Sequence, residues 1–354
     1  MLEIRCTGTP YEIGLTHGTF AQAKISSSIL FYARTFHESC SLPWGNVAHE
    51  ASKYVESLET SAPRYLEEIE GIATGSGTSF LDILALNVRS EIMFGLSSRP
   101  PAKDTSDAPS DACTSVAWKG STSSFLAQNW DWDVEQSSNL LICHISQPGT
   151  GIPDFSMVTE AGIISKIGLN EAGTGCCLNA LRCRGVDSSK LPIHFALRRV
   201  LESPSRQDAV RAIKETGVAA AGHIQVSDPT GSSGLECTAK TVDEMIAQGG
   251  RCACHTNHLL LGTSGDVDEF AWPDSPARMA RVRELTARIA EPSLDAITAI
   301  LKDTEGRPVP INRGRSSASS FETLFTIVMD LVGRFARVTF GRPTDVREEV
   351  VFSF

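Results

Sequence analysis

The chain has 354 residues, and its 32 Lys+Arg against 42 Asp+Glu give a formal net charge of −10. Hydrophobic residues make up 41% of it, which is ordinary for a globular protein and enough for a sizeable core. The acidic balance argues against non-specific nucleic-acid binding, and no run approaches the roughly 20 apolar residues of a membrane helix. At about 150 residues per domain, two domains or one large α/β domain are expected.

The cysteines and the two chain ends predict a cellular compartment. Ten cysteines are scattered along the chain without the dense spacing of a disulfide scaffold, and there is no Asn-x-Ser/Thr sequon. The start, Met1–Cys6, lacks the basic and apolar regions of a signal peptide, and the end, Phe352–Phe354, is not a Ser-Lys-Leu peroxisomal signal. We therefore predict a cytoplasmic protein with mostly reduced thiols.

The first part of the chain has the apolar spacing of helices. Residues 10–95 contain three such stretches, at about 11–34, 47–73 and 80–93. Residues 96–112, LSSRPPAKDTSDAPSDA, interrupt this pattern with Ser, Pro, Asp and Ala. We predict an exposed, mobile loop there, which separates the helical part from a part of different texture.

After this loop, short apolar or β-branched runs predict strands. The predicted strands are residues 114–118, 125–130, 140–146, 156–159, 162–168, 173–178, 223–226, 235–239, 324–329 and 336–340. Asp228–Gly231 predicts a hairpin turn, and helices are expected at 192–203, 206–216, 276–291 and 293–303. Strands, then helices, then strands predict two packed sheets with helices outside.

Cys113 lies where the predicted loop meets the first predicted strand. Its position alone is equally compatible with a plain loop thiol. However, a Ser, Thr or Cys at the start of a strand behind an exposed loop can become an N-terminal nucleophile if the chain is cut just before it. The freed α-amine, with a pKa of about 7.7–8.0, then lies on the same residue as the thiol and can act as its base.

Two other segments carry candidate polar groups. Asp131 ends the next predicted strand, where a carboxylate can hold the α-amine, although a polar turn is the plainer interpretation. Asn257 can donate to an oxyanion in acyl transfer. Zinc is the alternative for that segment, but Cys-x-Cys-His-x-x-His over 252–258 is not a usual zinc spacing. We therefore predict no metal. No Gly-rich phosphate motif precedes a helix, so we also predict no nucleotide-binding fold and no cofactor.

Several segments resemble, in the same order, motifs of the acyl-coenzyme A:6-aminopenicillanic-acid acyltransferase (isopenicillin N acyltransferase) family of N-terminal-nucleophile hydrolases. The resemblance extends from about residue 6 to Phe352, and an ordered set of matches is more specific than any single motif. The segments are Gly8–Gly18, Glu67–Ala73, Leu86–Glu91, Cys113–Thr114, Gln128–Asp131, Thr159–Ile164, Gly168–Asn170, Gly234–Glu236 and His255–His258.

The resemblance implies an α+β fold, the four-layer αββα sandwich of N-terminal-nucleophile hydrolases. It implies that a precursor cleaves itself between Ala112 and Cys113. The mainly helical fragment 1–112 and the fragment 113–354, with the two sheets, then remain associated as one composite domain. Cys113 would be the nucleophile with its own α-amine as proton acceptor, Asp131 would orient that amine, and Asn257 would help to bind the oxyanion. Ser319 would carry over as a further site residue.

The implied activity moves an acyl group from a thioester, with acyl-CoA as the expected co-substrate, to a small amine or amino-acid-like acceptor, as in secondary metabolism. Two positions depart from the family pattern: Ala112 stands where Gly is typical, and Ser320 where Arg is expected, with Arg313 and Arg315 out of register. Two alternatives therefore stay open. One is an amidohydrolase on the same scaffold, distinguished by how the acyl-enzyme partitions between water and an added amine. The other is an unprocessed, inactive binding relative, which would keep its 354-residue chain intact.

Overall fold

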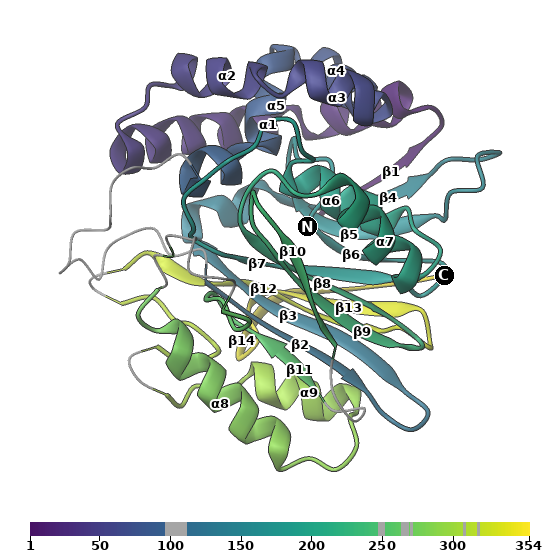
Figure 1. Ribbon diagram of the computed structural model, residues 1–354, viewed down its shortest axis with the longest axis vertical. Coiled ribbons are helices and arrows are strands. Elements are labelled where there is room, and N and C mark those ends of the chain that lie inside the picture. The colour runs from purple at the N-terminus through teal and green to yellow at the C-terminus, as the bar shows by residue number, and fades with distance from the viewer. Residues whose placement is uncertain (96–111, 247–251, 263–268, 270–271, 307–308, 317–318) are drawn as a thin grey trace.

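The computed structural model describes all residues except 96–111, 247–251, 263–268, 270–271, 307–308 and 317–318. The predicted mobile loop thus lies outside the described residues, apart from Ala112, which begins a strand. Two stacked sheets lie between two layers of helices (Figure 1). This is the predicted αββα arrangement.

The larger sheet has eight strands in the order β1-β4-β5-β6-β7-β8-β9-β10. Strand β1 pairs in parallel with β4, and the other neighbours are antiparallel. The strands are β1 (Leu2–Thr7), β4 (Leu140–Ser146), β5 (Phe155–Glu160), β6 (Ile167–Asn170), β7 (Gly175–Ala180), β8 (Gly222–Asp228), β9 (Gly231–Cys237) and β10 (Val242–Ile246).

The smaller sheet has six strands in the order β11-β2-β3-β12-β13-β14, and all of its pairs are antiparallel. In its centre, Cys113 on β2 is opposite Trp130 on β3, and Ala112 is opposite Asp131. The strands are β11 (Ala253–His255), β2 (Ala112–Lys119), β3 (Ser124–Asp133), β12 (Phe321–Asp330), β13 (Phe335–Arg342) and β14 (Asp345–Ser353).

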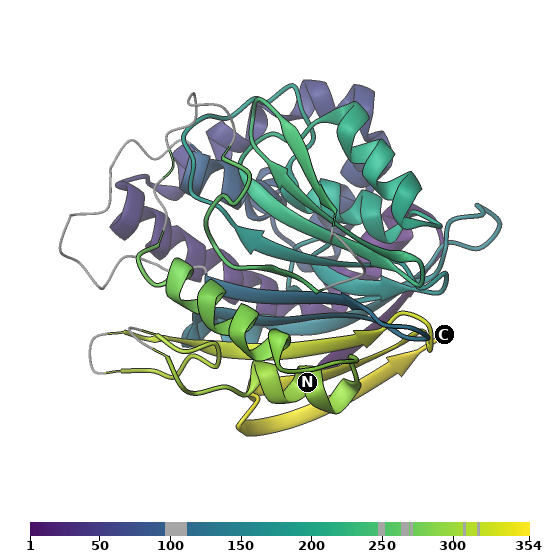
Figure 2. The same ribbon diagram turned by 60° about the horizontal axis from the view of Figure 1, so that its bottom comes forward.

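Helices cover the outer faces of both sheets. The larger sheet is covered by α1 (Pro10–Cys40), α2 (Trp44–Ser52), α3 (Val55–Ser61), α4 (Pro63–Ser76), α5 (Phe80–Asn87), α6 (Ile193–Leu201) and α7 (Arg206–Thr216). The smaller sheet is covered by α8 (Ser275–Ala287) and α9 (Leu294–Leu301), as Figure 2 shows. No helix in the described part of the chain is long and apolar enough to span a membrane.

The N-terminal glycine-containing motif is explained by close helix packing. A capping box between Thr9 and Glu12 starts α1. Along this helix, a Cβ on Gly14 would come within 2.0 Å of a backbone oxygen of α4, and one on Gly71 of α4 would come within 2.2 Å of a backbone oxygen of α1. Only glycine permits this approach of the two backbones.

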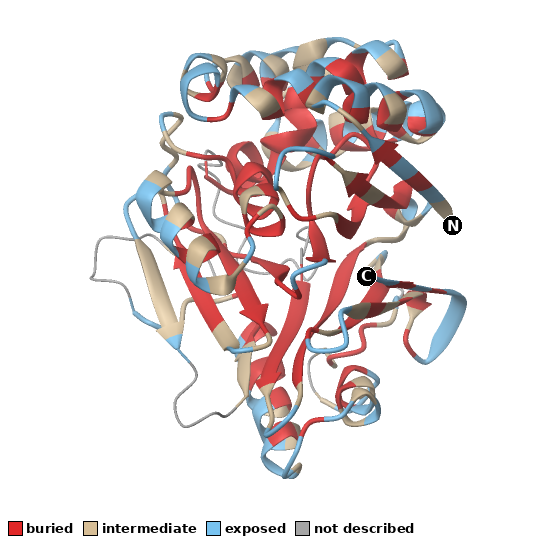
Figure 3. Cartoon of the chain, turned by 90° about the vertical axis from the view of Figure 1, so that its right-hand side faces the viewer, coloured by how far each residue is buried: buried red, intermediate tan, exposed pale blue. Residues whose placement is uncertain are grey.

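The alternation of side chains along β2 decides which way the candidate nucleophile faces. Cys113 and Ala117 belong to the core between the two sheets, whereas Val116 and Trp118 belong to a separate core beneath α8 and α9. Figure 3 shows both sheets buried along most of their length. The Cys113 thiol therefore faces the space between the sheets, opposite the Trp130 ring.

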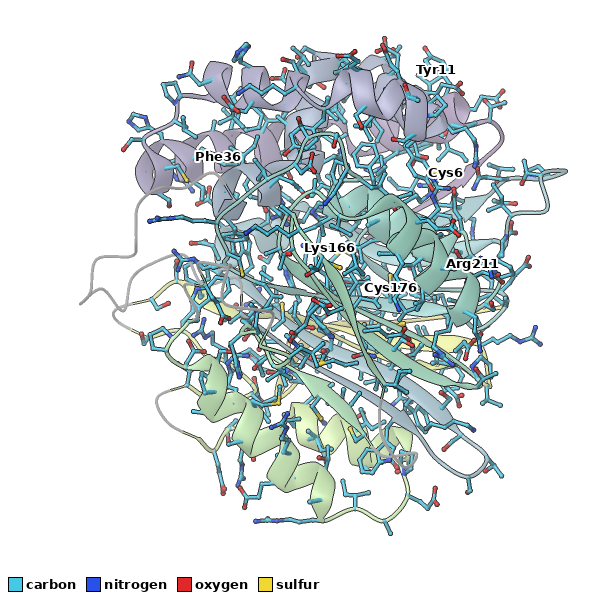
Figure 4. The ribbon with its side chains drawn as sticks, in the orientation of Figure 1. Cys6, Tyr11, Phe36, Lys166, Cys176 and Arg211 are labelled. Carbon is cyan, nitrogen blue, oxygen red and sulfur yellow. The ribbon has the colours of Figure 1, made fainter. Side chains whose placement is uncertain are left out.

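A buried ionic cluster joins the N-terminal helices to the larger sheet. The Glu160 carboxylate, fully buried on β5, accepts hydrogen bonds from Arg89 at 2.6 Å, from Lys166 at 2.6 Å and from the Tyr32 hydroxyl. Burial acts to raise the pKa of Glu160, but the two cations hold it well below its usual value. Lys166 lies near the middle of the molecule (Figure 4), with its Nζ 3.6 Å from the centre of the Trp130 ring.

The strand prediction for residues 162–168 is wrong. Most of this segment is a buried irregular turn, and β6 begins only at Ile167. The Asn87 side chain donates to Gly162 O at 2.8 Å and accepts from Ile164 N at 2.9 Å, so it satisfies backbone groups that a neighbouring strand would otherwise pair. The apolar residues of this segment are buried, as their hydrophobicity predicts, but most of them do not form a strand.

Candidate active site

Cys113 is 1% exposed as the second residue of β2. Its backbone N–H, which would become the α-amine after cleavage, donates to Asn257 Oδ1 at 2.9 Å. The Asn257 Nδ2 donates to Ala180 O, at the end of β7, at 3.1 Å. Asn257 thus joins β2, the strand of Cys113 in the smaller sheet, to a strand end of the larger sheet.

Arg278 on α8 contacts the same backbone from the outer face of the smaller sheet. Its Nη1 donates to Cys113 O at 2.6 Å and to Thr114 Oγ1 at 3.2 Å. Its Nη2 donates to Asn257 Oδ1 at 2.8 Å, and its Nε to Asp274 Oδ2 at 2.8 Å. One buried guanidinium therefore fixes the Cys113 peptide and the Asn257 amide relative to each other.

Asp131 lies on the α8 side of the smaller sheet, because its neighbours Trp130 and Trp132 point into the core between the sheets. Its Oδ1 accepts from the Thr323 hydroxyl at 2.6 Å, and its Oδ2 has no hydrogen-bond partner among the described residues. Burial raises the pKa of Asp131 to about 6, against the lowering effect of the Arg313 guanidinium and the Thr323 hydroxyl.

The thiol and the charged groups therefore lie on opposite faces of one sheet. The charged side chains of Asp131, Asp274 and Arg278 surround the Cys113 backbone on the α8 face, whereas the thiol faces the other way. This arrangement suits groups that act on the backbone nitrogen and carbonyl of Cys113. In the uncleaved chain that nitrogen donates to Asn257 rather than to Asp131, so an amine-orienting role for Asp131 stays a prediction.

Of the predicted site residues, the structure brings Cys113, Asp131 and Asn257 into one region, with Ala112 beside Cys113 on β2. Ser319 is not joined to them by any described hydrogen bond. It precedes β12, where its Oγ accepts from Phe321 N at 3.3 Å and its backbone pairs with Ser316. Its catalytic role stays a prediction.

Sequence reasoning missed three groups of this site: Arg278, Asp274 and Thr323. The spacing of Asp274 and Arg278, four residues apart at the start of α8, was a readable signal of an ion pair on one helix face. Arg313, set aside as out of register, is buried and lies 3.4 Å from Asp274. Ser320 is exposed instead, and its hydroxyl donates to Asp133 at 2.5 Å.

The segment that carries Asn257 is held at both ends by one carboxylate. Glu236 on β9 is buried; its Oε1 lies 2.9 Å from His255 Nε2 and accepts from Leu260 N at 2.6 Å, and its Oε2 accepts from Leu261 N at 3.0 Å. Burial acts to raise the pKa of Glu236, but these hydrogen bonds hold it below its usual value. Between these points, Ser275 Oγ accepts from Asn257 N at 2.7 Å.

We expect Glu236→Ala to lower the free energy of unfolding by about 3–5 kcal/mol, because it leaves a buried imidazole and two N–H groups without their acceptor. Urea denaturation of the unprocessed protein measures this. Glu244→Ala on β10 is the control, since Glu244 pairs with the half-exposed Lys214 and its loss should cost about 1 kcal/mol or less. Equal losses in the two variants would show that Glu236 does not hold this segment.

The residues considered for zinc make other contacts. The sulfurs of Cys252 and Cys254 lie 3.4 Å apart, and His255 is engaged by Glu236 and by Thr256 O at 2.8 Å. Across the described residues, no group of three or more His, Cys, Asp or Glu side chains is arranged to hold a metal ion.

The two stacked sheets between helical layers have the αββα fold of the N-terminal-nucleophile hydrolase type, and Cys113 is buried near the start of β2. A crystal structure of a conjugated bile acid hydrolase mutant from Clostridium perfringens superposes with a TM-score of 0.50 at 14% identity, covering 68% of this chain and 92% of that one. This similarity shows the fold alone.

The sequence narrows the class to one family. Residues 118–345 match the family of acyl-coenzyme A:6-aminopenicillanic acid acyl-transferase. The 40 kDa form of acyl-coenzyme A:6-aminopenicillanic-acid-acyltransferase from Emericella nidulans is 34% identical over 357 aligned residues, covering 100% of this chain and 96% of that protein. The chain belongs to this family, as its motifs predicted.

A more distant relative is named as a hydrolase. The β-alanyl-dopamine/carcinine hydrolase of Drosophila melanogaster is 24% identical over 233 residues, which cover 62% of this chain and 59% of that protein. The family and these relatives together support an acyltransferase or amidohydrolase enzyme.

Proposed function

We propose that this protein is a self-processing cysteine acyltransferase that moves an acyl group from a thioester, such as acyl-CoA, to a small amine or amino-acid-like acceptor. The observation that carries the proposal is the arrangement around Cys113. Its thiol faces the space between the sheets, while Asn257 and Arg278 hold its backbone N–H and carbonyl at 2.9 Å and 2.6 Å.

Processing begins when the Cys113 sulfur attacks the carbonyl carbon of Ala112. The C–N bond breaks, the nitrogen takes up a proton, and a thioester joins Ala112 to the Cys113 sulfur. Water then hydrolyses this thioester, which gives a carboxylate on Ala112 and a free thiol and α-amine on Cys113. The Asn257 oxygen, which accepts from this nitrogen before cleavage, is placed to accept from the new amine afterwards.

In each later turnover the α-amine takes the thiol proton, and the sulfur attacks the carbonyl of the donor thioester. The donor leaves as a thiol, with the proton returned to it, and the acyl group stays on Cys113. An amine attacks this acyl-enzyme, forms an amide and releases the thiol. Asp131 would orient the α-amine, and fragments 1–112 and 113–354 would remain associated throughout.

Intact mass of purified wild-type protein beside Cys113→Ala tests the proposal. We expect masses for residues 1–112 and 113–354 in the wild type and a single full-length mass in the variant. The processed protein should then form a covalent acyl adduct on Cys113 when mixed with an acyl thioester. A full-length mass in both proteins after long incubation would contradict self-processing and favour a binding function.

Hydrolysis is the second candidate, favoured by the hydrolase among the relatives. The same acyl-enzyme would form from an N-acyl amide, and water would replace the amine in the second step. Measuring how the acyl group divides between water and an added amine at increasing amine concentration separates the two activities.

A further inference from the structure

Arg182 is a half-buried cation for which the described residues supply neither a carboxylate nor a hydrogen-bond acceptor. The four buried arginines among the described residues differ, because each faces a carboxylate. Arg89 pairs with Glu160, Arg198 with Glu68, and both Arg278 and Arg313 with Asp274. A half-buried guanidinium that no carboxylate among the described residues faces is costly in a protein, although the net charge of −10 means that carboxylates outnumber cations.

The guanidinium lies over one aromatic ring, which itself packs against a second ring. Its central carbon lies 5.2 Å from the centre of the Trp272 ring, and Phe94 packs edge-on against Trp272 at 5.8 Å. Both rings are at least nine-tenths buried. Burial lowers the pKa of Arg182 below its usual value, although the neighbouring Cys40 acts to raise it.

Arg182 lies close along the chain to a residue that contacts the Cys113 site. It follows β7 by two residues, and Ala180, the last residue of β7, accepts the Asn257 amide at 3.1 Å. Two residues of chain span at most about 7 Å. Trp272 likewise lies two residues before Asp274, whose Oδ2 accepts a hydrogen bond from Arg278 Nε at 2.8 Å. Arg182 and Trp272 are thus each two residues along the chain from a residue of the hydrogen-bond network that positions the Cys113 backbone.

We propose that Arg182, backed by Trp272 and Phe94, binds the carboxylate of a substrate whose reacting group reaches Cys113. A single planar guanidinium matches one carboxylate in a bidentate pair, and the aromatic rings beside it suit an apolar group next to that carboxylate. The substrate class is then an amine or amide that carries a carboxylate, such as an amino acid or an N-acyl amino acid. This inference rests on the proposed acyl transfer at Cys113, but its first test does not require turnover.

The first test compares two alkylating reagents of the Cys113 thiol, anionic iodoacetate and neutral iodoacetamide, in the processed enzyme. Peptide mass spectrometry reads the rate at Cys113. We expect Arg182→Met to slow the alkylation of Cys113 by iodoacetate by roughly 10- to 100-fold. The rate of alkylation by iodoacetamide should stay within about twofold of the wild-type rate. Arg182→Lys should recover part of the iodoacetate rate, because it restores the charge without the planar fork.

Arg199→Met is the matched control, since Arg199 is also half-buried and lies 5.8 Å from an aromatic ring, that of Tyr65 on the outer helical layer. It should change neither rate. If Arg182→Met slows both reagents equally or neither, no carboxylate site exists there. Loss of self-cleavage in Arg182→Met alone would make the residue structural and would also overturn the proposal.

The second test uses turnover with butyryl thioesters and two acceptors, alanine and alaninamide. Arg182→Met should raise KM for alanine and leave kcat, and KM for alaninamide, nearly unchanged. A rise in KM for butyryl-CoA, without one for the phosphate-free N-acetylcysteamine thioester, would assign Arg182 to the donor's phosphates and contradict the carboxylate site. If the wild type forms no acyl-enzyme at all, the proposed function fails, while the alkylation result still decides the anion site.

Discussion

Replacing Arg278 by lysine is expected to slow the release of fragment 113–354 by about 100-fold or more. The guanidinium makes hydrogen bonds to Cys113 O, Thr114 Oγ1, Asn257 Oδ1 and Asp274 Oδ2 with donors in one rigid plane. A lysine keeps the positive charge beside Asp274, so the fold should survive. Its ammonium cannot hold the nucleophile's peptide and the Asn257 amide at the same time, and the scissile bond loses its fixed position.

The rate is measured by intact mass after synthesis in a cell-free system or after release from a denaturant. Arg281→Lys serves as the control, because Arg281 lies on the same helix but pairs with Asp303 and Glu305 at the surface. Self-cleavage at the wild-type rate in Arg278→Lys would show that Arg278 only stabilises α8. A variant that unfolds at the temperature of the assay would be tested again with Arg278→Gln.

Asp131→Asn should lower turnover of the processed enzyme by about 100-fold or more, while making the protein more stable above pH 6. Burial raises the pKa of Asp131 to about 6, so the folded state binds a proton more tightly than the unfolded state does. The stabilisation from this proton is fully present below the usual aspartate pKa near 4 and is lost as the pH rises through about 6. At higher pH the native state carries a buried carboxylate at a cost of about 3 kcal/mol, which asparagine removes.

Urea denaturation between pH 4 and pH 8, with Cys113→Ala in both proteins to keep them as single chains, measures this difference. The gain in unfolding free energy from asparagine should grow from pH 4 to pH 7 and then level off. In the wild type, turnover should rise with pH through about 6, and this limb should be absent in the variant. A pH-independent difference in stability would show that Asp131 is not the group that titrates there.

The order of most elements and the position of Cys113 near the start of a strand could be predicted from the sequence, because both depend on local signals. The strand-start position of Cys113 and the alternation on β2 and β3 follow from the sequence near each residue. The edge strands β10 and β11 were missed because they are short, and β1 and β14 because polar residues interrupt their apolar pattern. Such strands form because a neighbour offers unpaired backbone groups, which no local pattern reveals.

The contacts around Cys113 were beyond sequence reasoning for a related reason. Arg278 and Asn257 are 165 and 144 residues away from it along the chain. Asn257 is expected to donate to an oxyanion, and this role stays a prediction; in the uncleaved chain its oxygen accepts from Cys113 N and from Arg278. The Asn257 oxygen faces Cys113 N because the Arg278 guanidinium also donates to this oxygen. Arg278 lies on α8, and the position of α8 against the sheet depends on tertiary packing that a local sequence pattern does not reveal.

The parallel pairing of β1 with β4 would have a consequence for the molecule if the proposed cleavage takes place. Residues 1–112 contribute a sheet strand, and they also contribute Arg89 and Tyr32, which hold Glu160 of the other fragment. A chain cut at Ala112–Cys113 would therefore be a non-covalent dimer of two pieces, each with an incomplete core. The intact chain refolds at a rate independent of its concentration, whereas the separated pieces must first meet. Peptide-bond cleavage would thus make folding hard to reverse. The intact chain would fold first and be cleaved second, and a cleaved protein that unfolds would refold only by a slow bimolecular reaction.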